Sequence, residues 1–132
     1  MTYYMSATLS LPFDEAVAAT EAALKTEGFG VLTRIDVRQT MKTKIDKDMP
    51  PYLILGACNP QLAFEALSLE NKVGTMLPCN VVVRQEGEAV EVAAIDPVAS
   101  MQAIPNPALK EAASMVRDKL ARVIAALGST AG

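Results

Sequence analysis

The chain has 132 residues, of which 51% are hydrophobic and 20% charged, and its formal net charge is −3. This length fits a single domain, expected over residues 1–132, whose one core needs neither disulfides nor a structural metal. The sequence contains no histidine, which excludes Ser-His-Asp and Cys-His nucleophiles and imidazole-ligated zinc or haem. Its acidic balance argues against a nucleic-acid partner, because such proteins carry unopposed basic charge.

The N-terminal residues 1–6 have neither the basic nor the apolar region of a signal peptide. The apolar runs are also far shorter than the roughly 20 residues that a membrane helix needs. We therefore expect a cytoplasmic protein with no membrane partner. In that compartment, Cys58 and Cys79 are expected to be reduced thiols.

The first predicted elements are a strand and a helix. Residues 3–11 alternate loosely as in a strand, and Pro12 opens the next element. Apolar residues at helical spacing follow over 13–24, so we predict an amphipathic helix there. Gly28 supplies the left-handed position beyond the end of this helix.

From residue 29 the hydrophobic period changes to two, which predicts a second strand over 29–38. One side of this strand is expected to carry Val31, Thr33, Ile35 and Val37. Residues 37–45 then fit a short helix capped by Asp36, although an irregular strand fits them as well.

A short apolar run over 52–57 predicts a third strand, which Asn59 and Pro60 convert into a helix as its N-cap and first residue. The inner stripe of that helix is expected to consist of Leu62, Ala63, Ala66 and Leu67.

Two further strands, 79–84 and 89–95, flank a turn and predict a β-hairpin. The last helix has a stripe of apolar residues over 109–127, and Gly128 is expected to end it. The element order is therefore β-α-β-(α)-β-α-β-β-α. This order predicts an α+β fold with one mostly antiparallel sheet and helices packed on one face.

Cys58 stands at the junction of a predicted strand and a helix N-terminus, where unpaired backbone N–H groups favour a thiolate. One interpretation is therefore a reactive thiol with a lowered pKa. The other is a small buried apolar residue, because free cysteines are usually buried. The carboxylates Glu65 and Asp96 are interpreted as a solvated helix residue and a turn former.

Cys79 follows Pro78 at the start of a predicted strand and is expected near the edge of the sheet. The two thiols would approach each other if the strand 52–57 is the neighbour of this one. Two thiols without histidine are too few for a structural zinc site, so we expect no metal within one chain. A third hypothesis is a metal site bridging a dimer, made of four thiolates or of two thiolates completed by carboxylates.

Three stretches carry a resemblance to a known family: 53–63 with Cys58 and Asn59, 77–83 with Pro78 and Cys79, and 95–97 before the last helix. In this order they resemble the bacterial and archaeal domain of unknown function 302 family, over essentially the whole chain. The resemblance implies a TBP-like α+β domain, often dimeric, and it implies no established activity. The TBP-like fold does not carry DNA binding with it.

The resemblance maps the motif residues of that family onto candidate catalytic residues Cys58 and Cys79 and candidate ligand-binding residues Cys58, Asn59, Pro60, Pro78 and Cys79. No cofactor is identified. Our first hypothesis is a non-catalytic module that binds a small molecule or a protein partner and acts as a homodimer. The alternative is a redox or sulfur-transfer protein with Cys58 as nucleophile and Cys79 as resolving thiol.

Overall fold

A computed structural model describes residues 2–130, with side chains described for 2–128. The chain forms five strands and five α-helices within this range, with one 3-10 helix. In chain order these are β1 (Tyr4–Leu9), α1 (Phe13–Thr26), β2 (Gly30–Asp36), α2 (Val37–Ile45), β3 (Tyr52–Cys58), α3 (Pro60–Leu69), η1 (Val73–Met76), β4 (Cys79–Glu86), β5 (Ala89–Ile95), α4 (Pro97–Ser100) and α5 (Pro107–Thr130).

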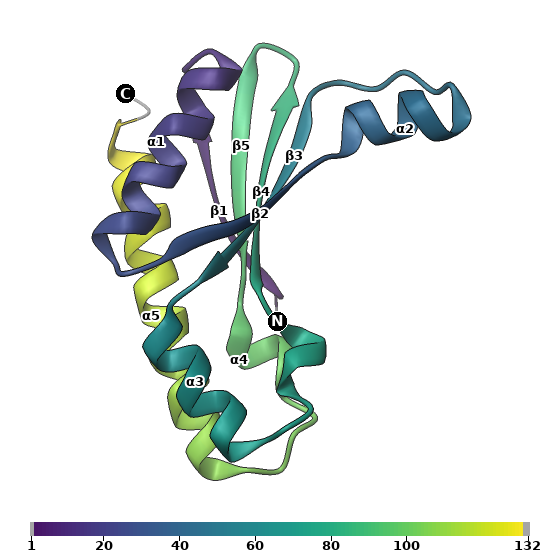
Figure 1. Cartoon of the computed structure of the whole chain (residues 1–132). Helices are drawn as coiled ribbons and strands as arrows, with labels where there is room; N and C mark the ends of the chain where they lie inside the picture. The colour runs from purple at the N-terminus through teal and green to yellow at the C-terminus, as the bar shows by residue number, and fades with distance from the viewer. Residues whose placement is uncertain (1, 131–132) are drawn as a thin grey trace.

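The five strands form one antiparallel sheet in the order β1-β5-β4-β3-β2. Helices α1, α3 and α5 lie on the same side of this sheet (Figure 1). The predicted α+β class, with an antiparallel sheet and helices on one face, is confirmed. The strand β4 is the central strand, and β1 and β2 form the two edges.

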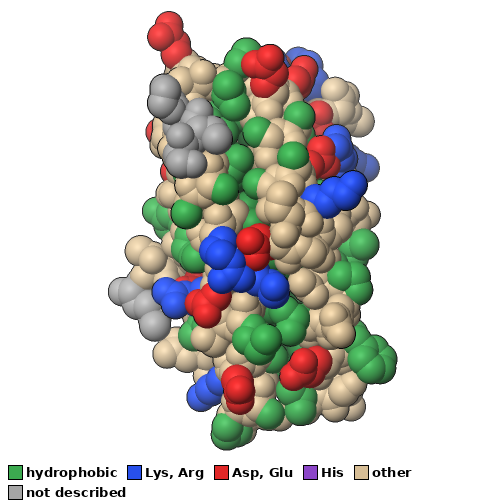
Figure 2. Space-filling model, turned by 90° about the vertical axis from the view of Figure 1, so that its left-hand side faces the viewer, with side chains coloured by type: hydrophobic (Ala, Val, Ile, Leu, Met, Phe, Trp, Pro, Cys, Tyr) green, Lys and Arg blue, Asp and Glu red, His purple; other side chains and the backbone are tan. Residues whose placement is uncertain are grey.

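The core lies between the sheet and α1 and α5. The central strands alternate as period two requires, with Val81 and Val83 of β4 and Val90 and Val92 of β5 fully buried. The stripe predicted for α5 packs against them through residues such as Leu120, which is fully buried. Figure 2 shows this helical side of the molecule, where acidic and basic side chains interleave among hydrophobic ones.

The opposite side of the sheet is exposed to solvent, and we call it the open sheet face. Its side chains are half-buried or exposed, unlike the fully buried ones of the core. We define it by the residues Tyr4, Tyr52, Ile54, Val82, Arg84, Glu91 and Ala93. Arg84 pairs there with Glu91 on the neighbouring strand, at 2.7 Å between Nε and Oε1.

Strand β2 and the end of helix α5 differ from the predictions. A bulge lies between Val31 and Thr33 in β2, so Val31 packs against the core while Thr33 lies beside Gly56 on the other face. The prediction that Val31 and Thr33 share one side of this strand was therefore wrong. The last helix continues past Gly128 to Thr130, because an exposed glycine weakens a helix without having to end it.

The short helices of the structure are α2, η1 and α4. Residues 37–45 do form a helix, capped by Asp36, whose side chain accepts a hydrogen bond from Gln39 N at 2.9 Å. The short elements η1 and α4 have no counterpart among the predicted elements, since they are too short to show a hydrophobic period. Among the described residues, no helix is long and apolar enough to cross a membrane.

Candidate functional site: the cysteine cavity

The site begins where β3 turns into α3. Asn59 caps the helix as predicted, with its Oδ1 accepting from Leu62 N at 3.2 Å and Pro60 following at the first helical position. Its Nδ2 donates to the carbonyl of Glu27 at 3.4 Å. One side chain therefore ties the start of α3 to the turn between α1 and β2.

Gly28 allows this contact. It has a φ of +83°, as predicted for the position beyond the helix end, and a Cβ there would lie 3.0 Å from Asn59 Nδ2. A side chain at this position would therefore be strained and would also push Asn59 away.

Gly56 brings Pro78 close to the end of β3. A Cβ on Gly56 would overlap the hydroxyl of Thr33 and lie 2.8 Å from Pro78 Cγ. Glycine at this position therefore lets the segment before β4 pack directly on the backbone of β3. The peptide bond between Leu77 and Pro78 in this segment is cis.

This arrangement brings the two cysteines together. Ala57 pairs with Cys79 in the β3–β4 register, so Cys58 lies one residue past the partner of Cys79 at the same end of these strands. Both thiols are free. Cys79 does begin a strand, but the expectation that it lies near the sheet edge was wrong, because β4 is central and the residue is only 7% exposed.

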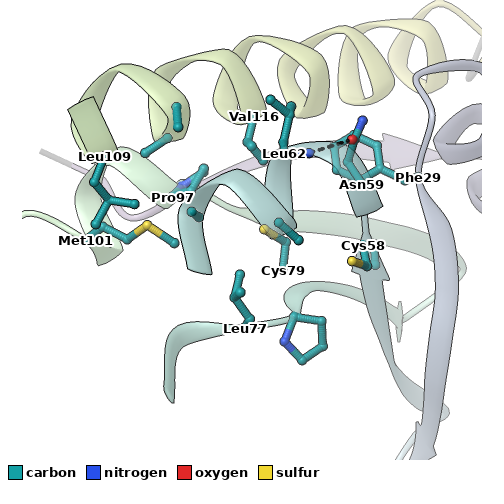
Figure 3. Close-up of a pocket in the computed structure, with 16 residues that line it drawn as sticks. Phe29, Cys58, Asn59, Leu62, Leu77, Cys79, Pro97, Met101, Leu109 and Val116 are labelled. Atoms are coloured by element: carbon teal, nitrogen blue, oxygen red, sulfur yellow. Dashed lines mark hydrogen bonds between the residues drawn. The ribbon is translucent and has the colours of Figure 1, made fainter. Parts of the chain in front are cut away.

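Both cysteines line an apolar cavity of about 30 Å³ between the sheet end, α3 and α5, which we call the cysteine cavity. Figure 3 shows Cys58 and Cys79 on the sheet side of this cavity and Leu109 and Val116 on the side of α5. The volume is enough for about one water molecule and far below the several hundred Å³ of a typical metabolite pocket. In this conformation the cavity has room only for a very small guest.

Burial in the cysteine cavity disfavours the thiolate form of both cysteines. Burial raises the pKa of Cys58 above its ordinary value of 9.0. Burial, together with the nearby Cys58, raises the pKa of Cys79 to about 11. Of the two interpretations of Cys58, the reactive thiol with a lowered pKa is therefore not supported, because burial shifts the pKa in the opposite direction.

Four of the five predicted site residues lie together in the structure. Cys58, Asn59, Pro78 and Cys79 all line the cysteine cavity, whereas Pro60 lies beside it with an exposed side chain. Sequence reasoning missed the far wall, which comes from Leu62, Ala66, Met101, Leu109 and Val116 among others. The apolar stripe of α5 signals Leu109 and Val116 as buried, but no sequence pattern places them opposite the cysteines.

The candidate acid-base groups lie elsewhere. Glu65 is exposed on α3. Asp96 caps α4 by accepting from Val98 N at 2.9 Å and pairs with Arg117 at 3.0 Å, so its role in the structure is to hold a turn. Among residues 2–130, no group of three or more His, Cys, Asp or Glu residues is placed to hold a metal ion.

Comparison with known proteins finds a matching family and matching solved structures. Residues 5–127 match the family described as "Domain of unknown function DUF302". The crystal structure of an uncharacterized conserved protein DUF302 from Bacillus stearothermophilus superposes with a TM-score of 0.90 at 31% identity, covering 96% of this chain and 99% of that one. No curated protein matches the chain.

Proposed function

The chain belongs to the DUF302 family, and we propose that this member is a non-catalytic interaction module that acts as a homodimer. The observation that carries the proposal is the open sheet face, where a whole side of the only sheet in the described chain lies in solvent. Apolar side chains gathered on a solvent-facing side of a domain are typical of interaction surfaces.

The composition of the open sheet face suits association. Tyr52, Ile54 and Val82 provide apolar contact area, and aromatic residues are common in the centre of interfaces. A hollow of about 350 Å³ lies over this face. The charges of Arg84 and Glu91 already neutralise each other across the strands, which lowers the cost of removing them from water.

The cysteine cavity fits a non-catalytic module. Burial raises the pKa of both thiols, which disfavours the reactive thiolate. Its small volume leaves room for no more than a very small apolar guest unless α3 moves. We therefore assign Cys58 and Cys79 a packing role beneath the interaction module.

The homodimer is tested by sedimentation velocity over a dilution series of the protein and of Val82→Glu. Val82 lies on the open sheet face, so a buried unpaired carboxylate there should convert the dimer to monomer. Ser114→Glu places the same charge at an exposed position of α5 and should leave the dimer intact. A monomeric parent protein, or a dimer that tolerates Val82→Glu, would overturn the proposal.

A second candidate function is thiol chemistry, and the observation that favours it is that both cysteines line one cavity. The Cys58 thiolate would take the outer sulfur of a persulfide donor, releasing the donor thiol, and Cys79 would then displace hydrosulfide to form a disulfide. Such chemistry needs an accessible thiolate at neutral pH. The raised pKa of Cys58 weighs against it.

This candidate is decided by the rate of iodoacetamide labelling at Cys58 between pH 6 and 10, with Cys79→Ser as the background. A labelling pKa below about 7, together with sulfur transfer from a low-molecular-weight persulfide that Cys58→Ser abolishes, would establish it. A labelling pKa of about 9 or above, without transfer, would leave the non-catalytic module.

A further inference from the structure

Helix α2 (Val37–Ile45) has few stabilising contacts with the rest of its chain. It stands apart from the sheet, on the side away from α1 and α5 (Figure 1). It has nine residues and none of them is buried within the described chain. Isolated helices shorter than about 12 residues are marginal in water. One cap and the two exposed ion pairs of Lys42, to Asp46 at 2.9 Å and to Asp48 at 3.2 Å, add little. A helix of this kind needs a further surface to pack against.

One side of α2 is apolar and the other is polar. Val37, Met41 and Ile45 follow one another at intervals of four residues and so share a face. Ile45 at the end of this stripe is 59% exposed, whereas Val37 and Met41 are half-buried within their own chain. The opposite side carries Gln39 and Thr43, which hydrogen-bond to each other at 3.1 Å. The apolar stripe is therefore the docking side.

The same chain offers a matching surface on its open sheet face. The hollow there has a volume of about 350 Å³ and is lined by apolar side chains that include Tyr52, Val82 and Ala93. A water molecule takes about 30 Å³ in the liquid, so the hollow holds the equivalent of about ten waters. Aliphatic side chains entering it would release water from both surfaces.

The charges of the two surfaces are also complementary. Within its bounds α2 carries three cations and no acidic residue. Lys42 already pairs with Asp46 and Asp48 just beyond the helix, which leaves the exposed Arg38 and Lys44 to face a partner. The turn between β4 and β5 carries the exposed Glu88, while Glu86 beside it already pairs with Arg84 at 2.9 Å. Figure 1 shows this turn and α2 at the same end of the molecule. A two-fold axis along the strands would therefore bring the cationic helix of each copy toward the acidic turn of the other.

We propose that α2 is a docking helix that packs its Val37–Met41–Ile45 face into the hollow of the open sheet face of a second copy, reciprocally about a two-fold axis. The inference rests on the proposed homodimer and adds what occupies its interface. It also explains how a nine-residue helix with no buried residue of its own stays folded: the partner copy supplies its missing core.

The test compares two substitutions on opposite sides of the same helix by sedimentation velocity. Ile45→Glu removes an apolar contact twice per dimer and places a carboxylate near the acidic turn, so the dimer Kd should rise at least about 100-fold. Thr43→Glu adds the same charge on the solvent side and should change the Kd by less than about threefold. Far-ultraviolet circular dichroism of each variant checks that the sheet and long helices are intact.

The outcomes separate the two proposals. A dimer that tolerates Ile45→Glu but not Val82→Glu would overturn the docking of α2 and leave the homodimer standing. A parent protein that is monomeric at all concentrations would overturn both. As an independent readout, benzoylphenylalanine at position 45 should form a photo-crosslink to peptides containing Tyr52 or Val82 of a second copy, and crosslinks confined to its own chain would contradict the docking.

Discussion

Gly56→Ala tests whether close packing of Pro78 on β3 holds the cysteine cavity together. The added Cβ would lie 2.8 Å from Pro78 Cγ, which real Cβ atoms essentially never show. The overlap with Thr33 is relieved by rotating an exposed side chain, but the Pro78 ring moves only with its backbone. Overpacking of this kind costs about 1 to 3 kcal/mol. We therefore expect Gly56→Ala to lower the free energy of unfolding by about that amount.

Gly30→Ala is the matched control, because a Cβ on Gly30 of β2 meets no atom within 4 Å. This change should be neutral or stabilise by about 0.4 to 1 kcal/mol through the unfolded chain. Urea unfolding followed by circular dichroism measures both variants, and the two should differ by about 1 to 4 kcal/mol. Equal stabilities for Gly56→Ala and Gly30→Ala would refute the close contact between Gly56 and Pro78.

Three further predictions concern the thiols and one cap. Because burial raises the pKa of Cys79 to about 11 from 9.0, the folded chain holds this proton more tightly, so the stability of the parent relative to Cys79→Ala should fall by about 2 to 3 kcal/mol between about pH 9 and 11. Parallel pH curves in urea unfolding would contradict this. At pH 8, peptide mapping should find alkylation of the half-buried Cys58 well before that of the buried Cys79, and equal rates would contradict the burial. Asp96→Ala should cost about 1 to 2 kcal/mol in thermal unfolding, whereas Asp96→Asn keeps a cap and should cost less than half as much; equal losses would show that the pair with Arg117, and not the cap, matters.

Much of the fold follows from local patterns. The stripe of α5, the Asn59–Pro60 start of α3 and the Asp36 cap of α2 are each decided by residues within one or two turns, and the structure contains all three. The bulge in β2 breaks the expected alternation because the pairing with β3, a distant segment, decides it. Local sequence carries no signal for that pairing.

The candidate site was predictable only in part for the same reason. The sequence places Cys58 beside a helix cap and Cys79 at a strand start, but their common cavity depends on the β3–β4 register. One of the two interpretations of Cys58, a thiol of low pKa, was wrong, because the helix N-terminus can be recognised in the sequence and the apolar wall that buries the thiol cannot. Met101 also lines the cavity, but it lies in a loop with no hydrophobic period, so the sequence does not mark it as buried.

The most direct test of the proposed function is native mass spectrometry of protein purified without reductant or chelator. The account predicts a dimer at twice the 14.0 kDa chain mass, with two unmodified thiols per chain and no bound metal. A monomer would contradict the homodimer. Extra sulfur, or a loss of two hydrogens that reductant reverses, would contradict the non-catalytic assignment and point to chemistry at Cys58 and Cys79.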